Sequence, residues 1–118
     1  MDGVIGGGSM IGSDAIRGYN DTFILSVLQE GDSYGYAISK RITEISENNY
    51  SIKETTLYSA FNRLEKNGFI ESFPGQITHG KKRTYYKITP SGQLYLEEKI
   101  NEWLLTKKVV ERFIKEEK

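Results

Sequence analysis

Apolar side chains recur at helical spacing through the first part of the chain and predict two successive helices. We expect the first over residues 13–29, with Ser13 or Asp14 as its N-terminal cap. The second is expected over residues 34–46, with Ser33 as its cap. The apolar positions of these helices, which would face a shared core, are Ile16, Phe23, Ile24, Val27, Leu28, Tyr36, Ile38, Ile42 and Ile45.

A third helix is predicted between Ser51 and Gly68. Ser51 and Glu54 have the spacing of a capping box, in which each side chain satisfies a backbone donor at the start of a helix. Gly68 supplies the left-handed residue at which many helices end. The apolar stripe of this helix, which we expect to be buried, consists of Leu57, Phe61 and Leu64.

The opposite face of the third helix carries short hydroxyl and amide side chains together with cations. Thr, Ser and Asn favour helices poorly, so a merely solvated face would be expected to hold more Glu, Gln and Ala. Short polar groups let a helix approach base edges in a DNA major groove, where Arg and Lys reach phosphates. A solvated amphipathic helix remains the simpler alternative. The residues of this face are Lys53, Thr55, Thr56, Tyr58, Ser59, Asn62, Arg63 and Lys66.

Two strands with a basic connection follow this helix. Residues 69–73 and 81–88 have the composition of strands, and Pro74 and Gly75 are expected to break the first. The connection 74–80 has seven residues, which is longer than a tight hairpin turn. Its end and the start of the next strand form a basic tip: His79, Gly80, Lys81, Lys82 and Arg83.

Side chains of the second strand alternate between two faces. The inner face, which can pack on the helices, holds Thr84, Tyr86 and Ile88, and the outer, cationic and aromatic face holds Lys81, Arg83, Tyr85 and Lys87. Basic runs are usually only solvated. Here the order of helix, helix, capped polar helix and basic hairpin is typical of a wing beside a recognition helix. The sequence therefore favours double-stranded DNA as the partner.

The last predicted helix covers residues 90–118, with Thr89 as its cap and Pro90 at the first helical position. Its apolar residues recur about every seven positions, with Lys107 interrupting the stripe. A helix of roughly 40 Å, at about 1.5 Å per residue, is too long for so small a body to cover. We therefore expect a second copy to cover it in a homodimer. The apolar positions are Leu96, Ile100, Trp103, Val110 and Phe113 or Ile114.

The charge is unevenly distributed along a chain of 118 residues whose net charge is zero. Residues 1–50 hold three Lys or Arg against seven Asp or Glu, whereas residues 51–88 hold seven against three. The middle of the chain is therefore basic, which suits a DNA surface confined to one side of the protein. Such a distribution also arises by accident of charge placement.

The composition offers little for catalysis or for metal binding. There is one His and no Cys, and no paired carboxylates, phosphate-binding glycine motif or metal-ligand cluster stands out. We expect no cofactor, no metal and no enzymatic activity. No apolar run is long enough to span a membrane and no signal peptide is evident, so we expect a cytoplasmic protein without a membrane partner.

Three ordered motifs resemble the PadR family of bacterial transcriptional regulators. They read GDSYGY at residues 31–36, TTLY at 55–58 with RLEKNGFI at 63–70, and GKKRTYYKITPSG at 80–92. The resemblance implies a winged helix-turn-helix dimer that represses a promoter. The single C-terminal helix is similar to the short subfamily that includes the lactococcal multidrug-responsive repressor.

The same resemblance implies a ligand site. In the lactococcal relative, a Trp of the last helix stacks on flat hydrophobic drugs at the dimer centre, and the matching residue here is Trp103. Its alternative role is dimer-interface core. Lys107 stands where the relative has an acidic residue, which argues against a preference for cationic drugs. The remaining residues implied at the ligand site are Ile100, Thr22 and Ser26.

The sequence thus predicts a mainly α protein with a small β-hairpin, divided into three parts. These are a tag-like disordered tail at residues 1–9, a winged helix-turn-helix domain at 10–89 and a dimerisation helix at 90–118. The predicted function is that of a homodimeric repressor that binds a pseudo-palindromic operator and is released by a small hydrophobic or aromatic ligand. The alternative is a winged-helix protein-interaction module without a ligand response. The predicted DNA-contacting residues are Lys53, Thr55, Thr56, Tyr58, Ser59, Asn62, Arg63, Lys81, Lys82 and Arg83.

Overall fold

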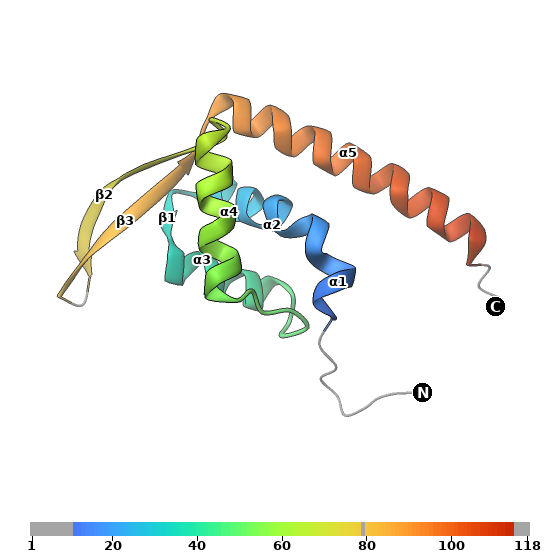
Figure 1. The fold of residues 1–118 in the computed structure, drawn as a ribbon, viewed down its shortest axis with the longest axis horizontal. Coiled ribbons are helices and arrows are strands. Elements are labelled where there is room, and N and C mark those ends of the chain that lie inside the picture. The colour runs from blue at the N-terminus through green and yellow to red at the C-terminus, as the bar shows by residue number, and fades with distance from the viewer. Residues whose placement is uncertain (1–10, 79, 115–118) are drawn as a thin grey trace.

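A computed structural model describes residues 11–78 and 80–114. The predicted tail at residues 1–9, His79 of the hairpin tip and the predicted helical residues 115–118 lie outside this part of the chain. Helices form the larger part of the fold, and a twisted hairpin and one long helix extend from them in opposite directions (Figure 1). Within the described residues, no helix combines the length and the apolar character needed to cross a bilayer.

The first predicted helix is divided into three pieces. They are α1 (Ser13–Ile16), the 3-10 turn η1 (Arg17–Tyr19) and α2 (Asn20–Glu30). The predicted caps were wrong, because Gly12 occupies the N-cap of α1 and no side chain caps it. α2 supplies the buried residues Ile24, Leu25, Val27 and Leu28.

The second helix, α3 (Gly35–Ile45), begins one residue later than expected. Ser33 does not cap it but lies in a short strand, β1 (Ser33–Tyr34), which the sequence did not predict. Ile38 and Ile42 are buried as expected, whereas Tyr36 and Ile45 are exposed and do not belong to the core face.

The third helix, α4 (Glu54–Lys66), begins at Glu54 with Lys53 as its N-cap and no capping side chain, so the predicted Ser51 capping box was wrong. Ile52 and Leu57, both buried, instead occupy the positions of a hydrophobic staple, which fixes the entry of the chain. The predicted end is confirmed, since Gly68 has a φ of 79°. The predicted apolar stripe is also confirmed, with Leu57, Phe61 and Leu64 each at most 2% exposed.

The hairpin consists of β2 (Ile70–Thr78) and β3 (Lys81–Ile88), and β1 pairs with the other edge of β3 in an antiparallel sheet of order β1-β3-β2. The expected seven-residue connection was wrong. β2 continues through Pro74 and Gly75 with an irregularity before Ile77, and Thr78 pairs with Lys81, so the turn is tight. β3 has the predicted bounds, and its Tyr86 is buried and stacks on Phe61, with ring centroids 4.2 Å apart.

The last helix, α5 (Pro90–Phe113), starts as predicted, with the hydroxyl of Thr89 accepting a hydrogen bond from the Gly92 backbone N–H at 3.0 Å. Only Gly92 and Leu96 of this helix are buried. Beyond Leu96 the helix still contacts η1 through Trp103 and Tyr19, and its end projects past the body (Figure 1). Trp103, Val110 and Phe113 are exposed by 42%, 46% and 79%.

Candidate nucleic-acid interface

Helix α4 presents a polar ridge to solvent. Since successive residues of a helix are rotated by about 100°, four side chains on the side opposite the buried stripe line up along the axis. All four are exposed: Thr55, Ser59, Asn62 and Lys66. We call them the α4 ridge. Three of the four are predicted DNA contacts.

The other predicted contacts of α4 lie around this ridge. Lys53 and Thr56 are exposed at the start of the helix. Arg63 is exposed too, but its guanidinium donates a hydrogen bond to Asp21 of α2, whose side chain is only 14% exposed. Because the Tyr95 hydroxyl also bonds to Asp21, at 3.4 Å, Arg63 is tied to α2 and α5. The sequence did not predict this ion pair.

Tyr58 lies on the flank of α4 that faces α3 and the hairpin. It is 42% exposed, and its ring meets Phe61 edge-on at 5.3 Å. The Tyr58 ring covers Gly35 at the start of α3, where a Cβ would lie 2.2 Å from the Tyr58 hydroxyl oxygen. Glycine at this position therefore leaves room for the Tyr58 ring over the start of α3.

A cleft of about 770 Å³ separates this flank from the hairpin. Cations of β3 form one wall, and aromatic and polar residues of α3 and α4 form the other. We call it the wing cleft. Its lining residues are Tyr34, Gly35, Tyr36, Ser39, Ile52, Glu54, Leu57, Tyr58, Lys81, Lys82, Arg83, Thr84 and Tyr86.

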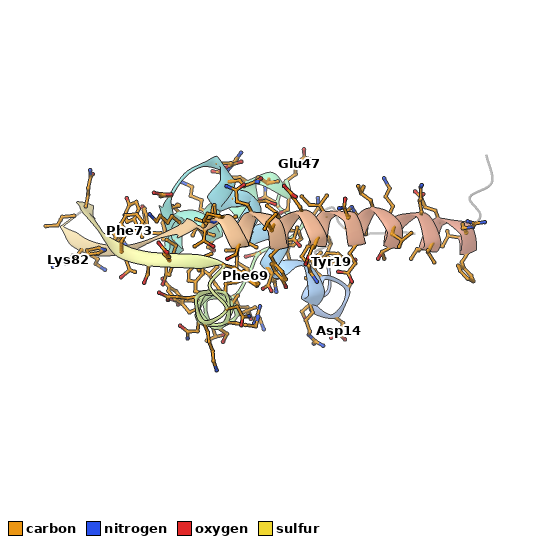
Figure 2. The ribbon with its side chains drawn as sticks, turned by 90° about the horizontal axis from the view of Figure 1, so that it is seen from above. Asp14, Tyr19, Glu47, Phe69, Phe73 and Lys82 are labelled. Carbon is orange, nitrogen blue, oxygen red and sulfur yellow. The ribbon has the colours of Figure 1, made fainter. Side chains whose placement is uncertain are left out.

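The three wing cations differ in their surroundings. Lys81 and Lys82 are exposed, and Lys82 lies at the far end of the hairpin (Figure 2). Arg83 is half-buried, with its Cζ 5.0 Å from the centre of the Tyr34 ring. The Arg83 Nε is buried and has no hydrogen-bond partner among the described residues. Arg83 thus connects the hairpin to β1 as well as facing the cleft.

Two aromatic residues of the wing cleft were not predicted from the sequence. Tyr34 was not assigned a role, and Tyr36 was assigned to the core although it is 65% exposed. At about 100° per residue, Tyr36 lies roughly opposite Ile38 and Ile42 on α3, so helical periodicity itself indicates that it faces away from the core. Tyr34 lies beside the hairpin because β1 pairs with β3, and the sequence did not predict β1.

A second hollow, of about 260 Å³, lies on the other flank of α4, against η1 and the start of α2. We call it the η1 hollow. Figure 2 looks along α4, and α1 with Asp14 lies on the same side of α5 as α4 does. The η1 hollow is lined by Arg17, Asn20, Thr55, Thr56, Ser59, Ala60 and Arg63.

The predicted ligand residues are only partly brought together. Trp103 and Thr22 line a hollow of about 240 Å³ between η1, α2 and α5, where the Trp103 ring meets Tyr19 edge-on at 5.5 Å. Ile100 and Ser26 do not line it. Within the described residues, no group of three or more His, Cys, Asp or Glu side chains is placed to hold a metal ion.

Comparison with known proteins identifies the family. The model of the transcriptional regulator PadR-like family matches residues 24–98, which span α2 to the start of α5. The chain belongs to the PadR-like family. As a member it is a transcriptional regulator and not an enzyme, as the sequence predicted.

Solved structures agree with this PadR-like assignment. A transcriptional regulator from Clostridium thermocellum is 61% identical, with a TM-score of 0.81 and coverage of 87% of this chain and 100% of its own. A PadR family regulator from Clostridium difficile is 37% identical, with a TM-score of 0.70 and coverage of 81% and 98%. The mainly α winged helix-turn-helix fold with one C-terminal helix is thereby confirmed.

A more distant relative was solved with nucleic acid. Bacillus subtilis PadR, in complex with operator DNA, is 25% identical with a TM-score of 0.61. The match covers 68% of this chain and 46% of that protein.

Proposed function

We propose that this PadR-like regulator is a homodimeric repressor that binds a pseudo-palindromic operator through α4 and the hairpin, which acts as its wing. The observation that carries the proposal is the α4 ridge of short polar side chains, with the cationic wing cleft along one flank. Thr55, Ser59 and Asn62 would approach base edges, and Lys81 and Lys82 would contact phosphates. The operator complex of Bacillus subtilis PadR supports DNA as the partner. Such a regulator would act in the cytoplasm.

The division of the chain follows from this proposal. Residues 10–89 would form the DNA-binding domain, and the helix from residue 90 would pair with a second copy. The exposed apolar side chains of α5 support the pairing, since they continue beyond the part of the helix that the body covers. Two-fold symmetry would place the two half-sites one or two helical turns apart, at roughly 34 Å per turn.

Release by a small hydrophobic or aromatic ligand is part of the proposal. The half-exposed Trp103 and the hollow beside it support this, together with the resemblance to the lactococcal repressor. A ligand would act by favouring a dimer with badly spaced recognition helices. Titration of Trp103 fluorescence with a panel of planar hydrophobic compounds tests this. Saturable quenching supports a ligand site, and its absence across the panel assigns Trp103 to the dimer interface.

DNA binding is tested by comparing the wild type with a variant carrying Lys82→Ala and Arg83→Ala. Fluorescence anisotropy of a labelled duplex is measured over a range of salt concentrations. The wild type is expected to bind with affinity that falls steeply as salt rises, and the variant with lower affinity and a shallower salt dependence. A protein-interaction module without DNA contacts would show no binding, and unchanged affinity of the variant would exclude the wing role.

A further inference from the structure

Each flank of α4 borders a hollow, and the proposed function uses only the wing cleft. Glu54 and Tyr58 lie on the flank beside the wing cleft, whereas Thr56 and Arg63 lie on the opposite flank beside the η1 hollow. The α4 ridge runs between them. In Figure 1 the hairpin lies on one side of α4 and α1 on the other.

A recognition helix in a major groove has a phosphate backbone on each side, because the groove is bounded by the two DNA strands. If the wing cleft faces one strand, the η1 hollow faces the other. The η1 hollow is lined by groups that bind phosphate in proteins, namely arginine guanidinium groups and hydroxyl donors. The donors are Arg17, Arg63, Thr55, Thr56 and Ser59.

The two arginines of the η1 hollow are not equally free to bind phosphate. Arg63 is held by the largely buried carboxylate of Asp21. Arg17 is paired at 2.8 Å with Asp14, and these side chains are 75% and 92% exposed. Exposed ion pairs of this kind contribute little to the stability of a protein. A DNA phosphate can therefore displace Asp14 from Arg17 more easily than Asp21 from Arg63.

Building on the proposed function, we propose that the η1 hollow is a second DNA backbone site. In this site Arg17 binds a phosphate with help from the hydroxyl of Thr56. The wing contacts one DNA strand, and this phosphate belongs to the other DNA strand. The DNA-binding surface then includes η1, N-terminal to the helix-turn-helix, and α4 is held between two phosphate contacts.

The experiment measures the salt dependence of binding to a duplex of about 30 base pairs of mixed sequence, roughly three helical turns. Arg17→Ala is expected to lower affinity by roughly three- to tenfold and to reduce the slope of log affinity against log salt by about 0.9, the value for one phosphate contact. Arg17→Lys should retain most of the slope. Asp14→Asn should raise affinity, because it removes a carboxylate that competes with phosphate for Arg17.

The matched control is Lys108→Ala, which removes an exposed cation from the distal part of α5. It should change neither the affinity for the duplex nor the slope of log affinity against log salt. Circular dichroism checks that the variants remain folded, as the exposure of Arg17 predicts. An unchanged slope for Arg17→Ala, alongside a reduced slope for the Lys82 and Arg83 variant, overturns this inference and leaves the proposed function intact. Failure of the wild type to bind any duplex overturns both.

Discussion

Gly92 and the hydroxyl of Thr89 fix the position of the start of α5 against the rest of the protein. A Cβ at Gly92 would lie 2.1 Å from the carbonyl oxygen of Phe69 and 2.9 Å from Cγ1 of Ile88. The hydroxyl of Thr89 donates to the carbonyl of Gly68 at 2.7 Å, at the end of α4. The start of α5 is therefore anchored to the end of α4 and the base of the hairpin.

Gly92→Ala is expected to lower the free energy of unfolding by about 1–3 kcal/mol, because the backbone at Phe69 cannot move aside without strain. Urea denaturation at a fixed protein concentration measures the change. Gly18→Ala is the matched control, since a Cβ there meets nothing within 4 Å, and it should be close to neutral. If the Gly92 variant and the wild type are equally stable, the close approach of Gly92 to the Phe69 backbone does not contribute to stability.

At the same scale, the surroundings of the arginines could not be predicted from the sequence. The ion pair between Arg63 and Asp21 joins residues 42 positions apart. Arg83 and Tyr34 meet only because β1 pairs with β3. Helical periodicity describes neighbours three or four residues apart and contains no information on such contacts. The exposure of Thr55, Ser59 and Asn62 was predictable, because it depends only on that periodicity.

At the scale of elements, the sequence predicted the helices and the hairpin better than their boundaries. Apolar spacing located α2, α3 and α4, and the Thr89–Pro90 signal located the start of α5. The cap at Ser51 was wrong because burial of Ile52 sets where α4 begins. The strand β1 was missed because two residues are too few to show alternation.

Strand β1 gives the hairpin its connection to the helices. Tyr34 pairs with Tyr85 of β3, and their ring centroids are 5.3 Å apart. With Arg83 over the Tyr34 ring, β1 holds the base of the wing against the start of α3.

Tyr34→Ala is expected to weaken DNA binding by roughly three- to tenfold, since a cation–π contact of about 1 kcal/mol and the ring packing that position Arg83 are lost. Tyr34→Phe keeps the ring and should bind like the wild type. Anisotropy with the same labelled duplex measures both. If the alanine variant is folded and binds as tightly as the wild type, Tyr34 does not position the wing.

At the scale of the whole molecule, α5 extends well beyond the body that it joins. The molecule measures 52 × 33 × 21 Å along its principal axes. Only the first part of α5 is buried, so the proposed dimer would cover the apolar side chains further along. The start of this helix was predictable from the sequence, but the predicted continuation through Ile114 was wrong, since Ile114 is an extended C-cap residue.

Val110→Glu is expected to shift the protein from dimer toward monomer, because a carboxylate would be buried in the proposed interface without a partner. Sedimentation velocity at several protein concentrations measures the distribution. Lys108→Glu, on another side of α5, serves as the control and should leave the dimer intact. A wild type that sediments as a monomer at all concentrations would contradict the pairing.

The proposed function is tested most directly by a footprint of the purified protein on the region upstream of its own gene. Two protected half-sites in inverted orientation, one or two helical turns apart, are predicted, because a two-fold dimer presents two α4 ridges to the same face of DNA. The Lys82 and Arg83 variant should protect them only at higher protein concentration. Uniform protection without a preferred site, or no protection at low salt, would contradict the proposed function.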